Sequence, residues 1–270
     1  MEVHALNLSK NFGNKVALRS VNFEISSNSL AILGHNGSGK TTLLSIISGL
    51  LKPSSGKLIL NGLEPYKKRE EILKFTSFVF EKPKFELKIK VSDYFKFLYD
   101  FYDKECVKEF KKKFIDNIGQ SYVYELSSGQ TQVLQLIQAL CSDSKIKILD
   151  EPFSHLDQRN ISYVGEYLKA KNFELIFSTH VIEEAEWLAS HIIILKDGKV
   201  VWYGKFEDLA RQDFFEVFFR FPLTRELEPI AKLGTIAIVR SDEDYLSKLV
   251  KDGKILGFKR LGLRRFYEDS

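Results

Sequence analysis

Gly34-His-Asn-Gly-Ser-Gly-Lys-Thr-Thr42 matches the phosphate-binding pattern G-x-x-x-x-G-K-S/T, with Gly34, Gly39, Lys40 and Thr41 at its fixed positions. In such a loop, successive backbone N–H groups point inward and close around phosphate oxygens. The helix that follows adds the positive end of its dipole. The pattern assigns Lys40 to the β- and γ-phosphates and the Thr41 hydroxyl to Mg²⁺.

The sequence on either side of this loop supports the match. Residues 29–33 form an apolar run typical of a buried strand, and residues 42–48 have the pattern of a helix. Gly49 is placed to cap that helix, and Pro53 lies beyond its end. The alternative, a glycine turn that arises by chance, does not explain a strand and a helix at these two places.

Composition and charge limit the classes of protein that the chain can belong to. The 270 residues are 44% hydrophobic and 28% charged, as in ordinary globular proteins. A net charge of +4 does not call for nucleic acid, and we expect no nucleic-acid partner. No apolar run approaches the ~18 residues that span a bilayer, and no signal peptide is visible. We therefore expect any contact with a membrane to go through a partner protein.

The sequence has two cysteines, Cys106 and Cys141, which fall in different predicted helices and lack the spacing of a metal site. Their pattern favours a reducing, cytosolic environment.

An aromatic residue lies just upstream of the phosphate loop. Residues 3–8 and 16–25 have the pattern of two strands around a turn at residues 11–14, which contains Phe12. Phe12 is either an apolar plug for the turn or a platform on which a nucleotide base stacks.

A second segment rich in aromatic residues spans residues 91–113 and has the spacing of one helix, with Ser92 as its expected N-cap. It is either a core helix of a helical subdomain or the wall of a groove for a partner helix. The residues alone leave both open.

Candidate catalytic groups follow two further strands. The strand at residues 145–151 ends in Asp150 and Glu151; near a phosphate loop, one acid can hold Mg²⁺ and the next can polarise water. The strand at residues 174–178 is followed by His180, at the strand end where ligands gather in α/β proteins. Before both lies Leu126-Ser-Ser-Gly-Gln130, whose serines and glycine at a helix start form another anion site.

These motifs, in this order and spacing, resemble the nucleotide-binding domain of ABC transporters, the ATPase subunit, over residues 3–209. The resemblance implies an α/β fold: a P-loop NTPase core sheet with an antiparallel β subdomain and a helical subdomain. It makes Leu126–Gln130 the family's signature, residues 146–151 its Walker B strand and residues 154–157 its D-loop. ATP and Mg²⁺ are the implied ligands. The residues that would hold the nucleotide are Phe12, Gly34, Asn36, Gly37, Ser38, Gly39, Lys40, Thr41, Thr42, Ser127, Ser128, Gly129, Gln130 and Asp157.

The resemblance also implies catalytic roles. Lys40 would bind the phosphates, Glu151 would act as the general base and His180 would sense the γ-phosphate. Thr41, Asp150 and Glu81 would serve the metal. The signature would touch the nucleotide held by another subunit, so a dimer would complete each site.

Three departures from the family pattern stand out. Glu81 occupies the position of the usual Q-loop glutamine and adds a negative charge near the metal; Ser128 replaces the first signature glycine. The basic residue that often follows the signature is replaced by Thr131. Because Glu151 and His180 are intact, we expect an active ATPase, either as a homodimer or with a non-identical partner subunit.

The domain organisation follows from this resemblance. We expect an ATP-binding domain at residues 1–210, with a helical subdomain at about 84–145, and a small C-terminal α+β extension at 211–270. In the extension, the pattern predicts strands at 214–221, 235–239 and 254–258 and helices at 224–233, 242–251 and 263–269.

The predicted function is the ATP-hydrolysing subunit that drives a separate membrane permease, an exporter by the character of the tail, at the cytoplasmic face of the membrane. The alternatives are an ATP-binding assembly or regulatory subunit with weak hydrolysis, and an ABC ATPase that does not transport.

Overall fold

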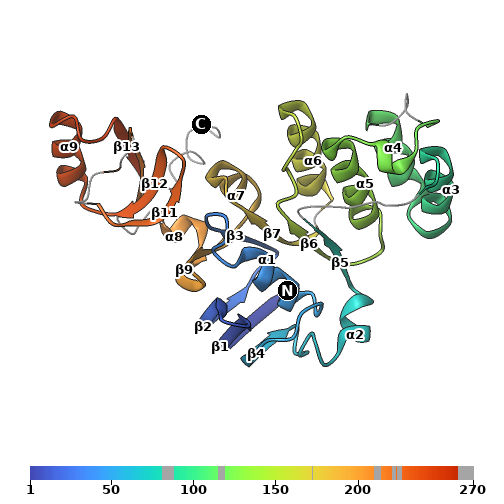
Figure 1. Ribbon diagram of the computed structural model, residues 1–270, viewed down its shortest axis with the longest axis horizontal. Helices are drawn as coiled ribbons and strands as arrows, with labels where there is room; N and C mark the ends of the chain where they lie inside the picture. The colour runs from blue at the N-terminus through green and yellow to red at the C-terminus, as the bar shows by residue number, and fades with distance from the viewer. Residues whose placement is uncertain are drawn as a thin grey trace.

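The computed structural model describes residues 1–80, 88–114, 119–171, 173–209, 214–220, 223 and 227–260. Figure 1 shows three sheets and their helices along the chain. The strands are β1 (Glu2–Phe12), β2 (Lys15–Ser26), β3 (Ser29–Leu33), β4 (Ser55–Leu60), β5 (Thr76–Val79), β6 (Ile146–Asp150), β7 (Glu174–Thr179), β8 (His191–Lys196), β9 (Lys199–Lys205), β10 (Phe214–Phe218), β11 (Pro229–Leu233), β12 (Ile236–Arg240) and β13 (Gly257–Arg260). The helices are α1 (Lys40–Ile47), α2 (Arg69–Leu73), α3 (Val91–Phe101), α4 (Lys104–Phe114), α5 (Ser128–Leu140), α6 (Gln158–Ala170), α7 (Ile182–Leu188), α8 (Phe206–Leu209) and α9 (Glu243–Lys251).

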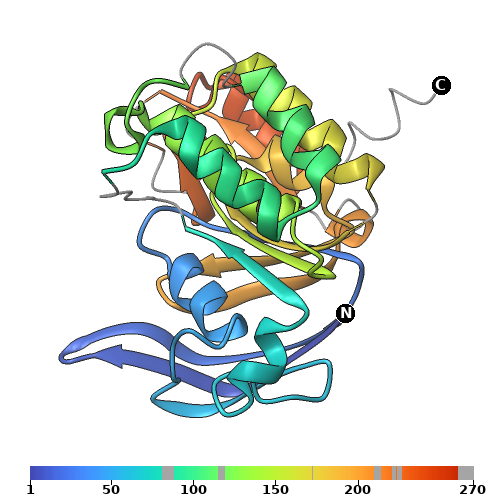
Figure 2. The ribbon, with the colours of Figure 1, turned by 90° about the vertical axis from the view of Figure 1, so that its right-hand side faces the viewer.

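The central sheet has the strand order β5-β6-β7-β3-β8-β9 and is parallel except for β9, which runs antiparallel to β8. Strands β3, β6 and β7 are almost continuous runs of buried residues because both faces of the sheet are covered. On one face, Ile32 packs in a cluster with Leu44 of α1. On the other, Leu33 packs in a cluster with residues of α5, α6 and α7. Figure 2 shows the sheet between these two layers.

The expected antiparallel subdomain is a three-stranded sheet in the order β2-β1-β4. It packs its apolar face, which includes Leu8 and Leu18, into the cluster that contains α1. Phe12 is the last residue of β1 and pairs with Lys15 across the hairpin, so the turn itself is Gly13–Asn14. The hairpin therefore holds an exposed aromatic ring at the end of the sheet.

The expected single helix over residues 91–113 is wrong, because the chain forms α3 and α4 with a break between them. Tyr102 has an extended backbone, and the Asp103 carboxylate accepts a hydrogen bond from the Cys106 N–H at 2.7 Å, which caps α4. The N-cap of α3 is Lys90 and not Ser92, which lies inside the helix. Apolar spacing continues through the break, so periodicity could not reveal it.

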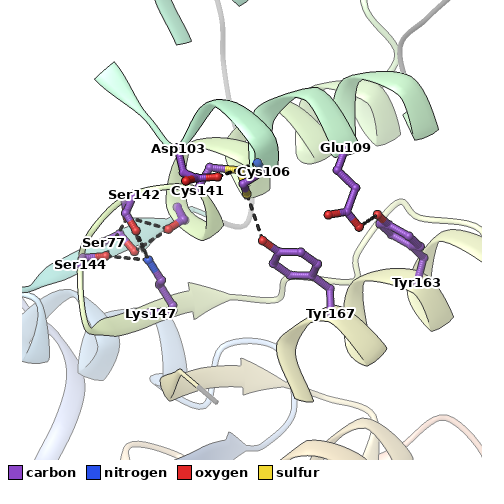
Figure 3. Close-up of a disulfide and its surroundings, with 11 residues drawn as sticks. Ser77, Asp103, Cys106, Glu109, Cys141, Ser142, Ser144, Lys147, Tyr163 and Tyr167 are labelled. Carbon is purple, nitrogen blue, oxygen red and sulfur yellow. Dashed lines mark hydrogen bonds between the residues drawn. A yellow bond between two sulfur atoms is a disulfide. The ribbon is translucent and has the colours of Figure 1, made fainter. Parts of the chain in front are cut away.

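A disulfide joins Cys106 of α4 to Cys141, the residue that caps the C-terminal end of α5. Figure 3 shows the bond, with the Tyr167 hydroxyl donating to the Cys106 Sγ at 3.1 Å. The pair contradicts the expectation of separate, reduced cysteines. Sequence spacing gave no signal of it because α4 packs against α5, which brings together residues that are 35 positions apart.

The C-terminal extension is a four-stranded antiparallel sheet in the order β11-β12-β10-β13 with α9 on one face. Its other face meets the central domain, where the Phe214 ring lies 6.3 Å from the Trp202 ring. The predicted helix at 224–233 is wrong over residues 229–233, which form β11. Leu233 pairs with Ile236, so Gly234 and Thr235 make a tight hairpin turn, with Gly234 at φ +59°. The predicted helix at 263–269 lies outside the described residues.

In the part of the chain that the structure describes, no helix has the length and apolar character needed to cross a membrane.

Candidate active site

The candidate site lies where three neighbouring parallel strands end. Strands β6, β7 and β3 are adjacent in the sheet, and at their carboxyl ends they carry Asp150, Thr179 and the start of the phosphate loop. Ligands bind in α/β sheets at this edge. The topology thus brings the phosphate loop together with two motifs that lie more than a hundred residues further along the sequence.

The phosphate loop enters α1 through Gly39, which has φ +108°. A Cβ at this position would lie 2.7 Å from the Ala17 carbonyl oxygen, so only glycine fits. Lys40 begins the helix and is 6% exposed. Its ammonium donates to the Gly34 carbonyl oxygen at 2.8 Å and lies 3.1 Å from Glu151 Oε1. The loop therefore holds a buried cation directly against the predicted general base.

Glu151 follows β6 in a left-handed backbone conformation, with φ +48°, which non-glycine residues seldom adopt. Its Oε1 faces Lys40, and its Oε2 lies 2.8 Å from His180 Nδ1. As a carboxylate, Glu151 accepts the hydrogen bond from Nδ1–H, which orients the imidazole. Glu151 thus joins Lys40 and His180 into one connected constellation.

A cleft of about 490 Å³ opens beside this constellation. Its lining residues are Phe12, Lys15, Ala17, Asn36, Gly37, Gly39, Lys40, Thr41, Thr42 and Glu151. Phe12, which comes from the antiparallel sheet, therefore lies on the same cleft as the phosphate loop. Lys15 was missed by sequence reasoning; a basic residue beside an aromatic residue in a hairpin is the signal that could have indicated it.

Ser38 also belongs to the loop, although it does not line the cleft. Its side chain is buried, and its carbonyl oxygen accepts a hydrogen bond from the Gly198 N–H at 3.0 Å. This bond ties the loop to the β8–β9 turn, where Asp197 and Gly198 both have positive φ, as the sequence predicts for a hairpin.

The signature residues lie elsewhere and are not among those that line the cleft. Ser127 is the N-cap of α5; its hydroxyl accepts from the Gln130 N–H, and the Gln130 side chain accepts from the Ser127 N–H, a capping box. Ser128 and Gly129 form the first turn. A Cβ on Gly129 would lie 2.7 Å from the His155 carbonyl oxygen, so this glycine packs against the loop that follows Glu151.

Asp157 ends that loop as the N-cap of α6 and accepts a hydrogen bond from the Asn160 N–H at 2.8 Å. Within one subunit, Asp157 therefore caps the start of α6, and this role does not depend on a dimer. Glu81, the proposed metal ligand of the Q-loop, lies outside the described residues.

The sequence did not indicate two polar side chains that lie behind Lys40, Glu151 and His180. Ser178 is fully buried beside Asp150. Glu184 of α7 accepts a hydrogen bond from the Thr179 hydroxyl at 2.5 Å, and burial raises the pKa of this carboxyl to about 7. Neither residue belongs to a motif, so only their three-dimensional neighbours identify them.

The fold and this edge of the sheet define an ATPase of the P-loop class. The family model for "ABC transporter" matches residues 18–154. An uncharacterized ABC transporter ATP-binding protein of Methanocaldococcus jannaschii is 36% identical over 214 residues, which cover 76% of this chain and 78% of the relative. The chain therefore belongs to the ABC transporter family of ATP-binding proteins, and it is an ATP-binding ATPase cassette.

Two further comparisons bear on function. The sulfate/thiosulfate import ATP-binding protein CysA of Bradyrhizobium diazoefficiens is 32% identical, and the alignment covers 98% of this chain and 80% of that one. The dimeric post-hydrolysis structure of the ATP-binding cassette MJ0796, bound to ADP and Pi, has a TM-score of 0.64 at 27% identity and covers 75% of this chain and 98% of that chain.

Proposed function

We propose that two copies of this chain close around ATP, that hydrolysis opens them again, and that the cycle drives a separate membrane permease from the cytoplasmic face. One observation carries the proposal: the phosphate loop and Glu151, to which His180 is hydrogen-bonded, line one cleft, while the signature at the start of α5 does not line it. A second copy is the simplest source of a signature for that cleft. The dimeric cassette structure supports this arrangement.

The residues present suit a magnesium ion. A hydroxyl from Thr41 and a carboxylate from Asp150 are hard oxygen donors of the kind that Mg²⁺ prefers, and both lie at the same end of the sheet. Bound there, Mg²⁺ would neutralise charge on the phosphates. Glu81 remains a proposed third contributor.

The contacts of Lys40 suggest how hydrolysis is prepared. Its ammonium pairs with Glu151 in the ligand-free arrangement. A phosphate bound in the loop competes with Glu151 for the Lys40 ammonium, because the phosphate-loop pattern assigns this lysine to the β- and γ-phosphates. The competition frees Glu151 Oε1 to take a proton from water, while His180 still holds Oε2. Lys40 and the loop amides then stabilise charge on the phosphate.

The direction of transport belongs to the proposal as well. The C-terminal extension suggested export, whereas the relatives include import ATP-binding proteins. Inverted vesicles that contain the permease and this chain test the direction, because their cytoplasmic face points outward. When ATP is added outside, an exporter should move substrate into the vesicles and an importer should move it out. Stimulation of ATP hydrolysis by the permease in liposomes tests the partnership itself.

The dimer is tested with purified Glu151→Gln protein by size-exclusion chromatography and light scattering, with and without Mg-ATP. Blocking hydrolysis should trap the closed pair, so we expect twice the monomer mass only with Mg-ATP. Glu166→Gln, at an exposed position on α6, is the matched control and should stay monomeric because it still hydrolyses ATP. A monomer that has bound ATP would contradict the homodimer and favour a non-identical partner.

A further inference from the structure

Ser178 lies between the two acidic residues of the site. It sits on β7 directly opposite Asp150 of β6 in the parallel register, and its side chain is fully buried. Its hydroxyl donates to Asp150 Oδ1 at 2.5 Å and accepts from the Glu151 N–H at 2.9 Å. One side chain therefore contacts the carboxylate of one acid and the backbone of the next.

The direction of these two bonds is fixed by chemistry. A hydroxyl has a single proton, and because an ionised carboxylate only accepts, that proton goes to Asp150. The hydroxyl oxygen then accepts a hydrogen bond from the Glu151 N–H, a buried group that needs a partner. Glu151 has φ +48°, a conformation that its own residue type does not favour. The bond to Ser178 helps to hold this turn, which directs the Glu151 carboxylate to Lys40 and His180.

We propose that Ser178 is a positioning residue for ATP hydrolysis: its hydroxyl fixes the Asp150 carboxylate and the backbone of Glu151 together, so that the metal ligand and the general base keep one geometry. This inference rests on the roles proposed above for those two acids. It predicts that loss of the hydroxyl impairs turnover and leaves nucleotide binding intact, because the phosphate loop is untouched.

Ser178→Ala removes the hydroxyl, and Ser178→Thr retains it. Removing a hydrogen bond to a charged group corresponds to about a 10- to 100-fold loss of kcat. We expect that loss in Ser178→Ala, with the KM for ATP within about twofold, and recovery in Ser178→Thr to within a few fold of wild type. Ser77→Ala is the matched control, because it deletes a hydroxyl on β5 that donates to the Ala139 carbonyl oxygen, away from the two acids. It should keep the wild-type kcat.

Amide hydrogen exchange of nucleotide-free protein gives a readout that does not depend on activity. Peptides that contain Glu151 should exchange at least ~10-fold faster in Ser178→Ala than in wild type or Ser178→Thr, because the N–H loses its partner. Peptides from α1 should not change.

The outcomes separate this inference from the proposed function. If wild type hydrolyses ATP and Glu151→Gln does not, but Ser178→Ala keeps both kcat and the slow exchange, the positioning role is refuted and the function stands. Equal falls in kcat for Ser178→Ala and Ser178→Thr also overturn it, since the hydroxyl is then not what matters. If wild type shows no turnover, the proposed function fails. Exchange at Glu151 that is the same in Ser178→Ala as in wild type would, in addition, overturn the link between Ser178 and Glu151.

Discussion

Reduction of the Cys106–Cys141 bond should lower the stability of one part of the molecule by an amount that depends on the length of the loop that the bond closes. The two residues are 35 positions apart, and opening a loop of that length restores unfolded-chain entropy worth about 4 kcal/mol at 25 °C. The bond ties α4 to the end of α5, whose other end carries the signature. We therefore expect the loss of stability to fall on α4 and α5.

The assay compares oxidised and reduced protein by urea denaturation with circular dichroism, and by hydrogen exchange of peptides from α4 and α5. The reduced form should unfold at lower urea and exchange faster in those helices, whereas ATP affinity stays within about twofold because α1, which follows the phosphate loop, packs in another cluster. A Cys106→Ala, Cys141→Ala variant should not respond to reductant. Unchanged urea midpoints, or free thiols detected in the oxidised protein by alkylation and mass spectrometry, would contradict this prediction.

Two further predictions concern single residues. Burial raises the pKa of Glu184 from its ordinary 4.5 to about 7, so the folded chain keeps a proton that the unfolded chain loses, and this group's contribution to stability declines as pH rises from 4.5 to 7. Glu184→Gln should remove that decline, and its gain over wild type in the free energy of unfolding should reach roughly 3 kcal/mol at pH 7.5; a gain that is constant with pH contradicts the assignment. Gly129→Ala should lower stability by about 1–3 kcal/mol in thermal denaturation, because its Cβ meets the His155 carbonyl oxygen; an unchanged melting temperature would contradict that contact.

The parts of the fold that follow local rules could be predicted from the sequence. The phosphate loop is a fixed glycine pattern, and β3, predicted at residues 29–33, has those bounds in the structure. The strands that end at Asp150 and Thr179 are short apolar runs covered on both faces, a pattern that stands out without tertiary information.

The features that depend on distant neighbours could not be predicted in this way. Residues 229–233 form β11 because β12 offers them a pairing edge, whereas their local pattern suited a helix. The end of α3 at Tyr102 depends on a backbone change that apolar spacing does not record. Cys106 and Cys141 are joined by the packing of helices and not by a spacing rule.

The same division applies to the site. Lys40, Glu151 and His180 come from motifs, and in the structure Glu151 contacts both of the others. Ser178 carries no motif, because a serine in a buried strand is significant only when the register places it opposite Asp150. The roles of the signature residues and of Asp157 in a dimer stay predictions.

Glu151, held by Lys40 and His180, is the proposed general base for ATP hydrolysis by this chain. The most direct measurement is phosphate release from Mg-ATP by purified wild-type and Glu151→Gln protein, with ATP binding measured in parallel. Loss of a general base corresponds to a fall of about 100-fold or more, so the variant should bind ATP and release almost no phosphate. Equal rates of phosphate release from the two proteins would contradict the claim.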